Sequence, residues 1–270
     1  MEMHLLSRKK YTESIKNLKG GRFMGPIVSL QDVSLRYHSL SGETPAVSHL
    51  SFTVEPGEFI SIVGPSGCGK STILSMLAGQ LPPSEGNIDV NGHIGYMLQK
   101  DYLLHWRSIR SNALLGLEIQ KKLTPENIAY VEELLEQYGL GEFKDHNPSQ
   151  LSGGMRQRVA LIRTLAVRPD ILLLDEPFSA LDYQTRLSVS DEIGTILRRE
   201  KKTAILVTHD ISEAISLSDR VIVLTKRPAT IKAVFPIHLT VTDYTPMKAR
   251  EATEFKDYFN AIWKELDVHV

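Results

Sequence analysis

The stretch Gly64-Pro65-Ser66-Gly67-Cys68-Gly69-Lys70-Ser71 decides the fold. It matches G-x-x-x-x-G-K-[ST], the pattern of a phosphate-binding loop. The apolar run 59–63 before it predicts a short buried strand, and apolar spacing over 71–78 predicts a helix. This order of elements surrounds a phosphate with backbone N–H groups and a helix N-terminus. We therefore expect Lys70 to neutralise the β- and γ-phosphate oxygens of a nucleotide and Ser71 to ligate Mg²⁺.

The surrounding sequence predicts an α/β fold of the P-loop NTPase type. Apolar and polar residues alternate over 27–37 and 46–54, which predicts an N-terminal antiparallel pair, and residues 86–90 and 93–97 flank Asn91-Gly92, which predicts a hairpin. Residues about 104–160 are helix-patterned and predict an inserted helical subdomain. Further strands (171–174, 204–207 and 221–224) alternate with helices (185–199 and 211–217), which predicts a mostly parallel, doubly wound sheet.

Two carboxylates follow the apolar run 171–174. Asp175 and Glu176 come at the end of this predicted strand, and the carboxyl ends of parallel strands share one edge of a sheet. We interpret Asp175 as a partner of Mg²⁺, directly or through another ligand, and Glu176 as the general base that polarises an attacking water.

A third element is the stretch Leu151-Ser152-Gly153-Gly154-Met155-Arg156-Gln157, which places two glycines at a predicted helix start. Here the sequence resembles the ATP-binding subunits of ABC transporters, whose LSGGQ-type signature it matches with Met155 in place of the commoner Gln. The other family motifs follow in order along nearly the whole chain from Met24. The resemblance implies that Tyr37 stacks on adenine, that Gln99 senses the nucleotide, and that His209 is the switch histidine.

These motifs give the expected site. Catalysis is assigned to Lys70, Gln99, Glu176 and His209, and Mg²⁺ binding to Ser71, Gln99 and Asp175. ATP binding is assigned to Tyr37, Gly64, Pro65, Ser66, Gly67, Cys68, Gly69, Lys70, Ser71 and Thr72, with Ser152, Gly153, Gly154 and Asp182 completing the site.

The resemblance also implies partners. In this family two ATPase domains dimerise head to tail, so that the signature of one caps the γ-phosphate held by the other, and we expect a second copy of this chain. The stretches 103–106, 151–158 and 219–228 are most similar to the nitrate, sulfonate and taurine importer group, although His105 stands where that group usually has Pro. This implies transmembrane permease subunits that hold the chain at the cytoplasmic face of the membrane and, indirectly, an extracytoplasmic solute-binding protein.

Composition limits the alternatives. With 31 Lys and Arg against 32 Asp and Glu, the net charge of -1 gives no case for non-specific nucleic-acid binding, and one Cys excludes an internal disulfide. Three alternatives stay open. They are a soluble ABC ATPase such as an iron–sulfur cluster assembly scaffold, an importer of a thiamine-precursor pyrimidine or riboflavin, and a small-molecule kinase.

The two ends of the chain are expected to lie outside the ATPase domain, which we place at 25–245. Residues 1–24 are basic and predict a weakly ordered extension, unless translation starts at Met24. Residues 246–270 are expected to form a C-terminal amphipathic helix that packs through one apolar face, made of Phe255, Phe259, Ile262, Trp263 and Leu266.

Overall fold

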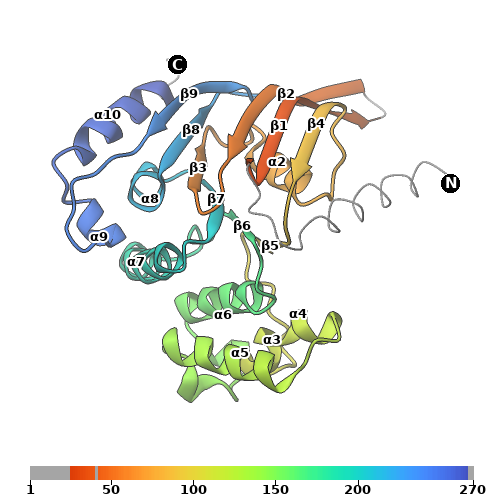
Figure 1. The fold of residues 1–270 in the computed structure, drawn as a ribbon, viewed down its shortest axis with the longest axis vertical. Coiled ribbons are helices and arrows are strands. Elements are labelled where there is room, and N and C mark those ends of the chain that lie inside the picture. The colour runs from red at the N-terminus through yellow and green to blue at the C-terminus, as the bar shows by residue number, and fades with distance from the viewer. Residues whose placement is uncertain (1–24, 40–41, 267–270) are drawn as a thin grey trace.

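A computed structural model describes residues 25–39 and 42–266 of the chain (Figure 1). The expectations for the basic N-terminal extension and for a start at Met24 concern residues outside this described part. The strands form a three-stranded sheet of order β2-β1-β4 and a six-stranded sheet of order β5-β6-β7-β3-β8-β9. The smaller sheet consists of β1 (Val28–Ser39), β2 (Gly42–Val54) and β4 (Glu85–Val90). The larger sheet consists of β3 (Phe59–Val63), β5 (Ile94–Met97), β6 (Ile171–Asp175), β7 (Thr203–Thr208), β8 (Arg220–Leu224) and β9 (Ile231–Pro236).

Helices connect the strands and surround the larger sheet (Figure 1). The helices that flank the sheets are α2 (Lys70–Leu77), α7 (Tyr183–Arg199), α8 (Ile211–Leu217), α9 (Pro246–Ala249) and α10 (Phe255–Leu266). The helical group between β5 and β6 consists of α3 (Ile109–Ala113), α4 (Leu115–Ile119), α5 (Pro125–Gln137) and α6 (Gly153–Leu165), with 3-10 turns at Gly141–Phe143 and Pro148–Gln150. The strands β3, β5, β6, β7 and β8 are parallel, so the predicted α/β fold with a mostly parallel sheet is confirmed.

The hairpin predicted at Asn91-Gly92 is wrong. The strand before this dipeptide, β4, pairs with β1 in the smaller sheet, whereas the strand after it, β5, pairs with β6 in the larger sheet. Asn91 donates its N–H to the Ile27 carbonyl at 2.8 Å, and a Cβ on Gly92 would lie 2.8 Å from Asp170 Cβ. The dipeptide therefore connects the two sheets, and glycine is favoured at position 92 because a larger side chain would collide with Asp170.

Alternate residues of the central strands supply two separate cores. Ile171 and Leu173 of β6 face the core shared with the smaller sheet and α2, whereas Leu172 and Leu174 face the core shared with the helical group and α7. Successive side chains of a strand point to opposite faces of the sheet, and each face of this sheet is covered by one of the two cores. A third core lies between β8, α8 and α10 and includes Val221 and Ile262.

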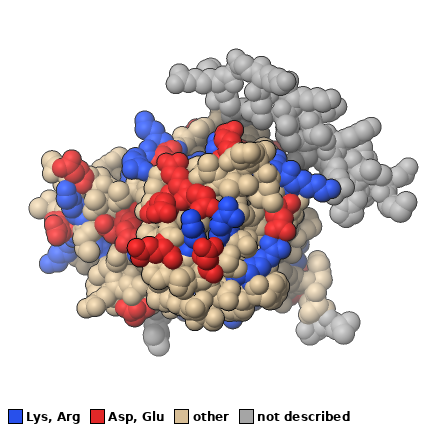
Figure 2. Space-filling view, turned by 90° about the horizontal axis from the view of Figure 1, so that it is seen from below, with Lys and Arg blue, Asp and Glu red and all other residues tan. Residues whose placement is uncertain are grey.

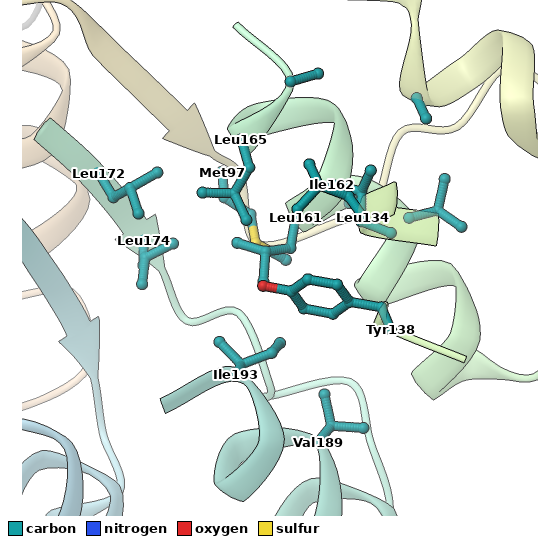
Figure 3. Packing of buried hydrophobic residues seen from close by; sticks show 14 of the residues in the cluster. Met97, Leu134, Tyr138, Leu161, Ile162, Leu165, Leu172, Leu174, Val189 and Ile193 are labelled. Atoms are coloured by element: carbon teal, nitrogen blue, oxygen red, sulfur yellow. The ribbon is translucent and has the colours of Figure 1, made fainter. Parts of the chain in front are cut away.

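Tyr138 joins the helical group to the sheet. It follows α5, is 2% exposed, and its ring lies between Leu161 of α6 and Ile193 of α7 (Figure 3). Its hydroxyl is buried without a hydrogen-bond partner, and burial raises the pKa of this phenol above its ordinary value.

The outer side of the helical group is polar. Figure 2 shows the molecule from this side, with acidic and basic side chains interspersed. The helical group contains the ion pairs Arg110–Glu132 and Arg107–Glu118.

The C-terminal segment differs from the single helix expected over 246–270. It contains a short helix, α9, and a longer one, α10, with a turn between them. Thr245 caps α9 by accepting the N–H of Lys248 at 3.2 Å, and Met247 donates its N–H to Asp191 of α7. Because α9 is fixed against α7 while α10 packs along α8, the chain has to change direction between them. Within the described residues, no helix is both long and apolar enough to span a bilayer.

Candidate functional site

The strand order brings the predicted chemical groups to one edge of the larger sheet. Val63 is in register with Thr208, Asp175 with Val207, and Met97 with Leu174, so the four neighbouring strands end together. The segments that follow them begin at Gly64, His209, Glu176 and Leu98. Residues separated by up to about 145 positions in the chain therefore meet beyond the carboxyl ends of parallel strands, where ligands bind in open α/β sheets.

The loop 64–69 joins β3 to α2 in a conformation that requires glycine. Gly67 and Gly69 have φ values of 72° and 127°, and a Cβ on Gly69 would lie 2.9 Å from the Ala46 carbonyl oxygen. Lys70 is 6% exposed, and its Nζ donates to the carbonyls of Gly64 at 2.8 Å and Pro65 at 3.1 Å. The lysine ammonium is thus enclosed by its own loop, next to the N-terminus of α2.

Asp175 lies against the start of α2. The Ser71 hydroxyl donates to Asp175 Oδ1 at 3.0 Å, and the Tyr96 hydroxyl donates to Asp175 Oδ2 at 3.4 Å. Burial raises the pKa of the Asp175 carboxyl, while the Ser71 hydrogen bond opposes this shift. Burial and the Asp175 charge together raise the pKa of Tyr96 to about 12.

Glu176 lies at the centre of a second group of polar side chains. Gln99 Nε2 and His209 Nδ1 each lie 3.2 Å from the same oxygen, Glu176 Oε2. The backbone of Glu176 has a φ of 44°, a left-handed conformation that costs a residue with a side chain about 1–3 kcal/mol and that clusters at functional sites. The N–H of Glu176 donates to the Val207 carbonyl at 2.8 Å, which fixes this strained position.

Tyr37 lies beside the start of α2 with its ring accessible. Its hydroxyl lies 3.1 Å from Thr72 Oγ1, and the side chain is 40% exposed. An exposed ring at this end of the phosphate loop is able to stack on a planar heterocycle.

The stretch 152–154 begins α6 and lies apart from the phosphate loop. Ser152 caps the helix by accepting the N–H of Met155 at 3.3 Å. A Cβ on Gly154 would lie 2.7 Å from Thr185 Cγ2, so glycine lets α6 approach α7. Asp182 caps α7 by accepting the N–H of Thr185 at 3.1 Å, and the hydrogen bonds at Thr185 lower the pKa of Asp182. The structure therefore brings Ser152–Gly154 near the 181–185 segment, whereas α6 and α2 are separated in Figure 1.

Comparisons with known proteins show which family the chain belongs to. A family profile described as ABC transporter matches residues 47–179. An uncharacterized ABC transporter ATP-binding protein of Bacillus subtilis, YtlC, is 48% identical over 243 residues, which cover 87% of this chain and 94% of YtlC. The chain is an ATP-binding subunit of an ABC transporter.

Two further relatives of this ABC ATPase carry more specific names. The taurine import ATP-binding protein TauB of Ruegeria pomeroyi is 38% identical over 213 residues, which cover 76% of this chain and 80% of TauB. The solved dimeric structure of the ATP-binding cassette MJ0796 in a post-hydrolysis state, bound to ADP and Pi, superposes with a TM-score of 0.68 at 29% identity. That match covers 78% of this chain and 99% of the MJ0796 chain. The resemblance to ABC ATP-binding subunits of the nitrate, sulfonate and taurine group and the expected ATPase activity are thereby confirmed, as is the P-loop NTPase fold.

The segment that follows Gln99 in the ABC ATPase is attached to the signature helix. Arg156 pairs with Asp101 at 3.1 Å, and Arg163 donates to the backbone carbonyls of Asp101 and Tyr102. An open groove of about 530 Å³ lies here and is lined by Lys100, Asp101, Tyr102, Leu103, Leu104, His105, Gln157 and Ala180.

Two side chains that touch the site are absent from the predicted site residues. Tyr96 contacts Asp175, and Ser179 lies 3.4 Å from Gln99 Nε2 while donating to the Glu176 carbonyl at 2.9 Å. Tyr96 lies in the last two residues of β5, three positions before Gln99. Ser179 lies in the loop after β6, three positions after Glu176. A search of the residues flanking each strand end could have found them.

Proposed function

We propose that this ABC ATPase powers an importer of a small solute of the nitrate, sulfonate or taurine type, with an aliphatic sulfonate as the leading candidate. The main support for ATP hydrolysis at this site is that Gln99, Glu176 and His209 meet beside the phosphate loop. The likeness to TauB, which is named a taurine import protein, supports the importer part.

Glu176 is assigned the role of general base. A water positioned at Glu176 Oε2 would give its proton to the carboxylate while its oxygen attacks the γ-phosphorus, and the bond from that phosphorus to the bridging oxygen of ADP breaks. Products are ADP and phosphate. His209 would hold this water and the γ-phosphate, because its ring nitrogen already lies 3.2 Å from the Glu176 oxygen. Lys70 and the backbone N–H groups of the loop would stabilise the negative charge on the phosphates.

The residues at the start of α2 fit Mg²⁺. Ser71 Oγ and Asp175 Oδ1 lie 3.0 Å apart, and hard oxygen donors are the ligands that Mg²⁺ prefers. We propose Ser71, Asp175 and Gln99 as the protein groups that hold it, together with phosphate oxygens. When bound, Mg²⁺ supplies electrostatic stabilisation of the transferred phosphoryl group.

A head-to-tail pair of these subunits would complete the nucleotide site. In support, the signature residues 152–154 lie apart from the phosphate loop of the same chain (Figure 1), and the MJ0796 cassette that superposes on this chain is dimeric. Ser152→Arg tests the pairing, because a large cation would block the facing phosphate. The variant alone should be inactive, whereas mixing it with a Lys70→Ala subunit should restore one intact site and part of the activity. Full activity of Ser152→Arg alone would refute the shared site.

The groove after Gln99 is the proposed docking site for the permease, which would hold the subunit at the cytoplasmic face of the membrane. Two aromatic side chains are exposed here: Tyr102, which lines the groove, is 60% exposed, and Trp106, which follows His105 in the chain, is 78% exposed. Large exposed aromatic residues are favourable anchors at protein interfaces. His105 lines the same groove, so its departure from the group's usual Pro falls at the surface that would contact the permease.

Co-purification tests the importer directly. The tagged chain should be recovered from gently solubilised host membranes together with an integral membrane subunit and a solute-binding protein, identified by mass spectrometry. The ligand of that binding protein would then name the solute. Recovery with soluble proteins only would refute the importer and favour the soluble ABC ATPase of the iron–sulfur assembly kind.

A further inference from the structure

Glu213 is a buried carboxyl that the proposed mechanism leaves unused. Among the described residues, three charged side chains are buried: Lys70, Asp175 and Glu213. The first two belong to the phosphate site. Glu213 lies in α8 with 3% exposure, next to Ala214 and one residue after Ser212. A buried ionisable group is costly unless it is hydrogen-bonded, so its partner identifies its role.

That partner is the residue before the switch histidine. The Thr208 hydroxyl donates to Glu213 Oε2 at 2.7 Å, and the same hydroxyl oxygen accepts the N–H of Asp210 at 3.0 Å. Asp210 Oδ1 in turn accepts the N–H groups of Ser212 and Glu213 at 2.8 and 3.1 Å. His209 therefore stands between two residues whose positions are both fixed by hydrogen bonds that lead back to Glu213.

We propose that Glu213 is a positioning residue for hydrolysis, which holds His209 against Glu176 through the Thr208 hydroxyl and makes this alignment depend on pH. The proposal rests on the role assigned to His209 above. Thr208 ends β7 and is in register with Val63, the residue before the phosphate loop, so the strand fixes one end of the connection and Glu213 orients the other. Small displacements of a positioned catalytic group are enough to lower a rate about 10²-fold.

The surroundings of Glu213 make its two protonation states accessible near neutral pH. Burial raises the pKa of Glu213 to about 7, and the Asp210 charge adds to this effect. The Thr208 hydrogen bond and the charges of Arg186 from α7 and Arg250 after α9 act in the opposite direction. Three other polar side chains lie against α8. The Tyr244 hydroxyl donates to the Ser216 carbonyl at 2.9 Å, and Arg198 of α7 donates to the Leu217 carbonyl at 3.2 Å, both at the end of the helix away from Asp210. Tyr258 of α10 accepts the His238 N–H at 3.2 Å, and the remaining packing is apolar.

Ionisation changes what the Thr208 hydroxyl can do. The carboxylate of Glu213 accepts a hydrogen bond from the Thr208 hydroxyl, so the lone pairs of the hydroxyl oxygen stay free to accept the Asp210 N–H. The protonated acid can instead donate its own proton to that oxygen, which occupies one of its two lone pairs and turns the Thr208 hydroxyl proton away from this acceptor. The ionised form should therefore hold His209 better, and turnover should rise as Glu213 loses its proton.

The test compares Glu213→Gln with the parent full-length chain in steady-state ATPase assays between pH 6 and 8.5. Glutamine resembles the neutral acid in shape but cannot ionise. The parent-to-variant ratio of kcat should be close to one at pH 6 and rise to about tenfold at pH 8.5, with its midpoint near pH 7 and KM for ATP unchanged. Titrations of other groups, which affect both proteins, cancel in this ratio.

Thr208 variants separate positioning from a general structural effect. Thr208→Val removes the hydroxyl and keeps the shape, and in that background Glu213→Gln should change kcat no further at any pH. Thr208→Ser keeps the hydroxyl and should restore the pH-dependent ratio. Unchanged ATP affinity and a cooperative thermal unfolding transition will show that each variant is folded.

Two results would overturn the proposal. One is a parent-to-variant ratio that does not change with pH, and the other is a full effect of Glu213→Gln that persists in Thr208→Val. His209→Ala distinguishes the source of such a failure. If His209→Ala abolishes turnover, only the role of Glu213 is refuted, whereas normal turnover of His209→Ala refutes the assigned role of His209 itself.

Discussion

Removing the Glu213 charge should change how the stability of the fold depends on pH. The ordinary pKa of a glutamate is 4.5, and burial raises that of Glu213 to about 7 in the folded chain. Between these two values the folded state keeps a proton that the unfolded state has lost. Stability therefore falls as pH rises through this window and is constant above it. Each pH unit is worth about 1.4 kcal/mol, so the folded state loses about 3 kcal/mol over the window.

Glu213→Gln has no such proton to lose. We expect its free energy of unfolding to match that of the parent near pH 4 and to exceed it by up to about 3 kcal/mol at pH 8. Urea unfolding, followed by far-ultraviolet circular dichroism at several pH values, measures this difference. Glu251→Gln is the matched control, because it makes the same chemical change at an exposed glutamate in the segment after α9. A Glu213→Gln difference that is equal at pH 5 and pH 8 would refute the reasoning.

Three other substitutions test the site and the core. Lys70→Ala should weaken ATP binding by about 10- to 100-fold, since hydrogen bonds to charged groups are worth about 1.5–3 kcal/mol, and a fluorescent ATP analogue whose affinity stayed unchanged would contradict the loop assignment. Glu176→Gln should bind ATP normally but lower turnover by about 10²–10⁴, the usual effect of a positioned base, and near-native hydrolysis would remove Glu176 from that role. Tyr138→Phe should raise the free energy of unfolding by about 1 kcal/mol in a urea titration, because the Tyr138 hydroxyl is buried without a partner, whereas a loss of stability would show that this hydroxyl is satisfied in solution.

Local patterns were sufficient for the elements of the core. The strand, loop and helix at 59–77 lie where the apolar run, the glycines and the helical spacing predict them. The antiparallel pair at 28–54 also follows from alternation, with Ser39 in register with Gly42 at its turn. These features depend on residues close together in the chain, so they are visible without tertiary structure.

The pairing of strands that are far apart in the chain could not be predicted from local sequence patterns. Asn91-Gly92 has the composition of a hairpin turn, yet the partners of β4 and β5 are β1 and β6, and no property of the dipeptide specifies them. The edge strand β9 was not predicted, although its burial alternates residue by residue along Ile231–Pro236. Glu213 was passed over for a related reason. Only the fold brings it against Thr208, and a single acidic residue in an amphipathic helix is ordinarily exposed.

The attachment of the segment 99–102 gives a physical connection between the proposed reaction centre, at Glu176, and the signature residues 152–154. Gln99 contacts Glu176 at one end of this segment, and Arg156 and Arg163 of α6 hold Asp101 and Tyr102 at the other. Helix α6 also starts at Ser152 and touches α7 through Gly154. Packed helices shift as units rather than deform continuously. A displacement of Gln99 that is passed on to Asp101 would either break the Arg156–Asp101 pair or move α6, and with it the signature residues. Under the proposed roles, a change at the γ-phosphate and a change at the permease groove would reach the facing subunit through this one helix.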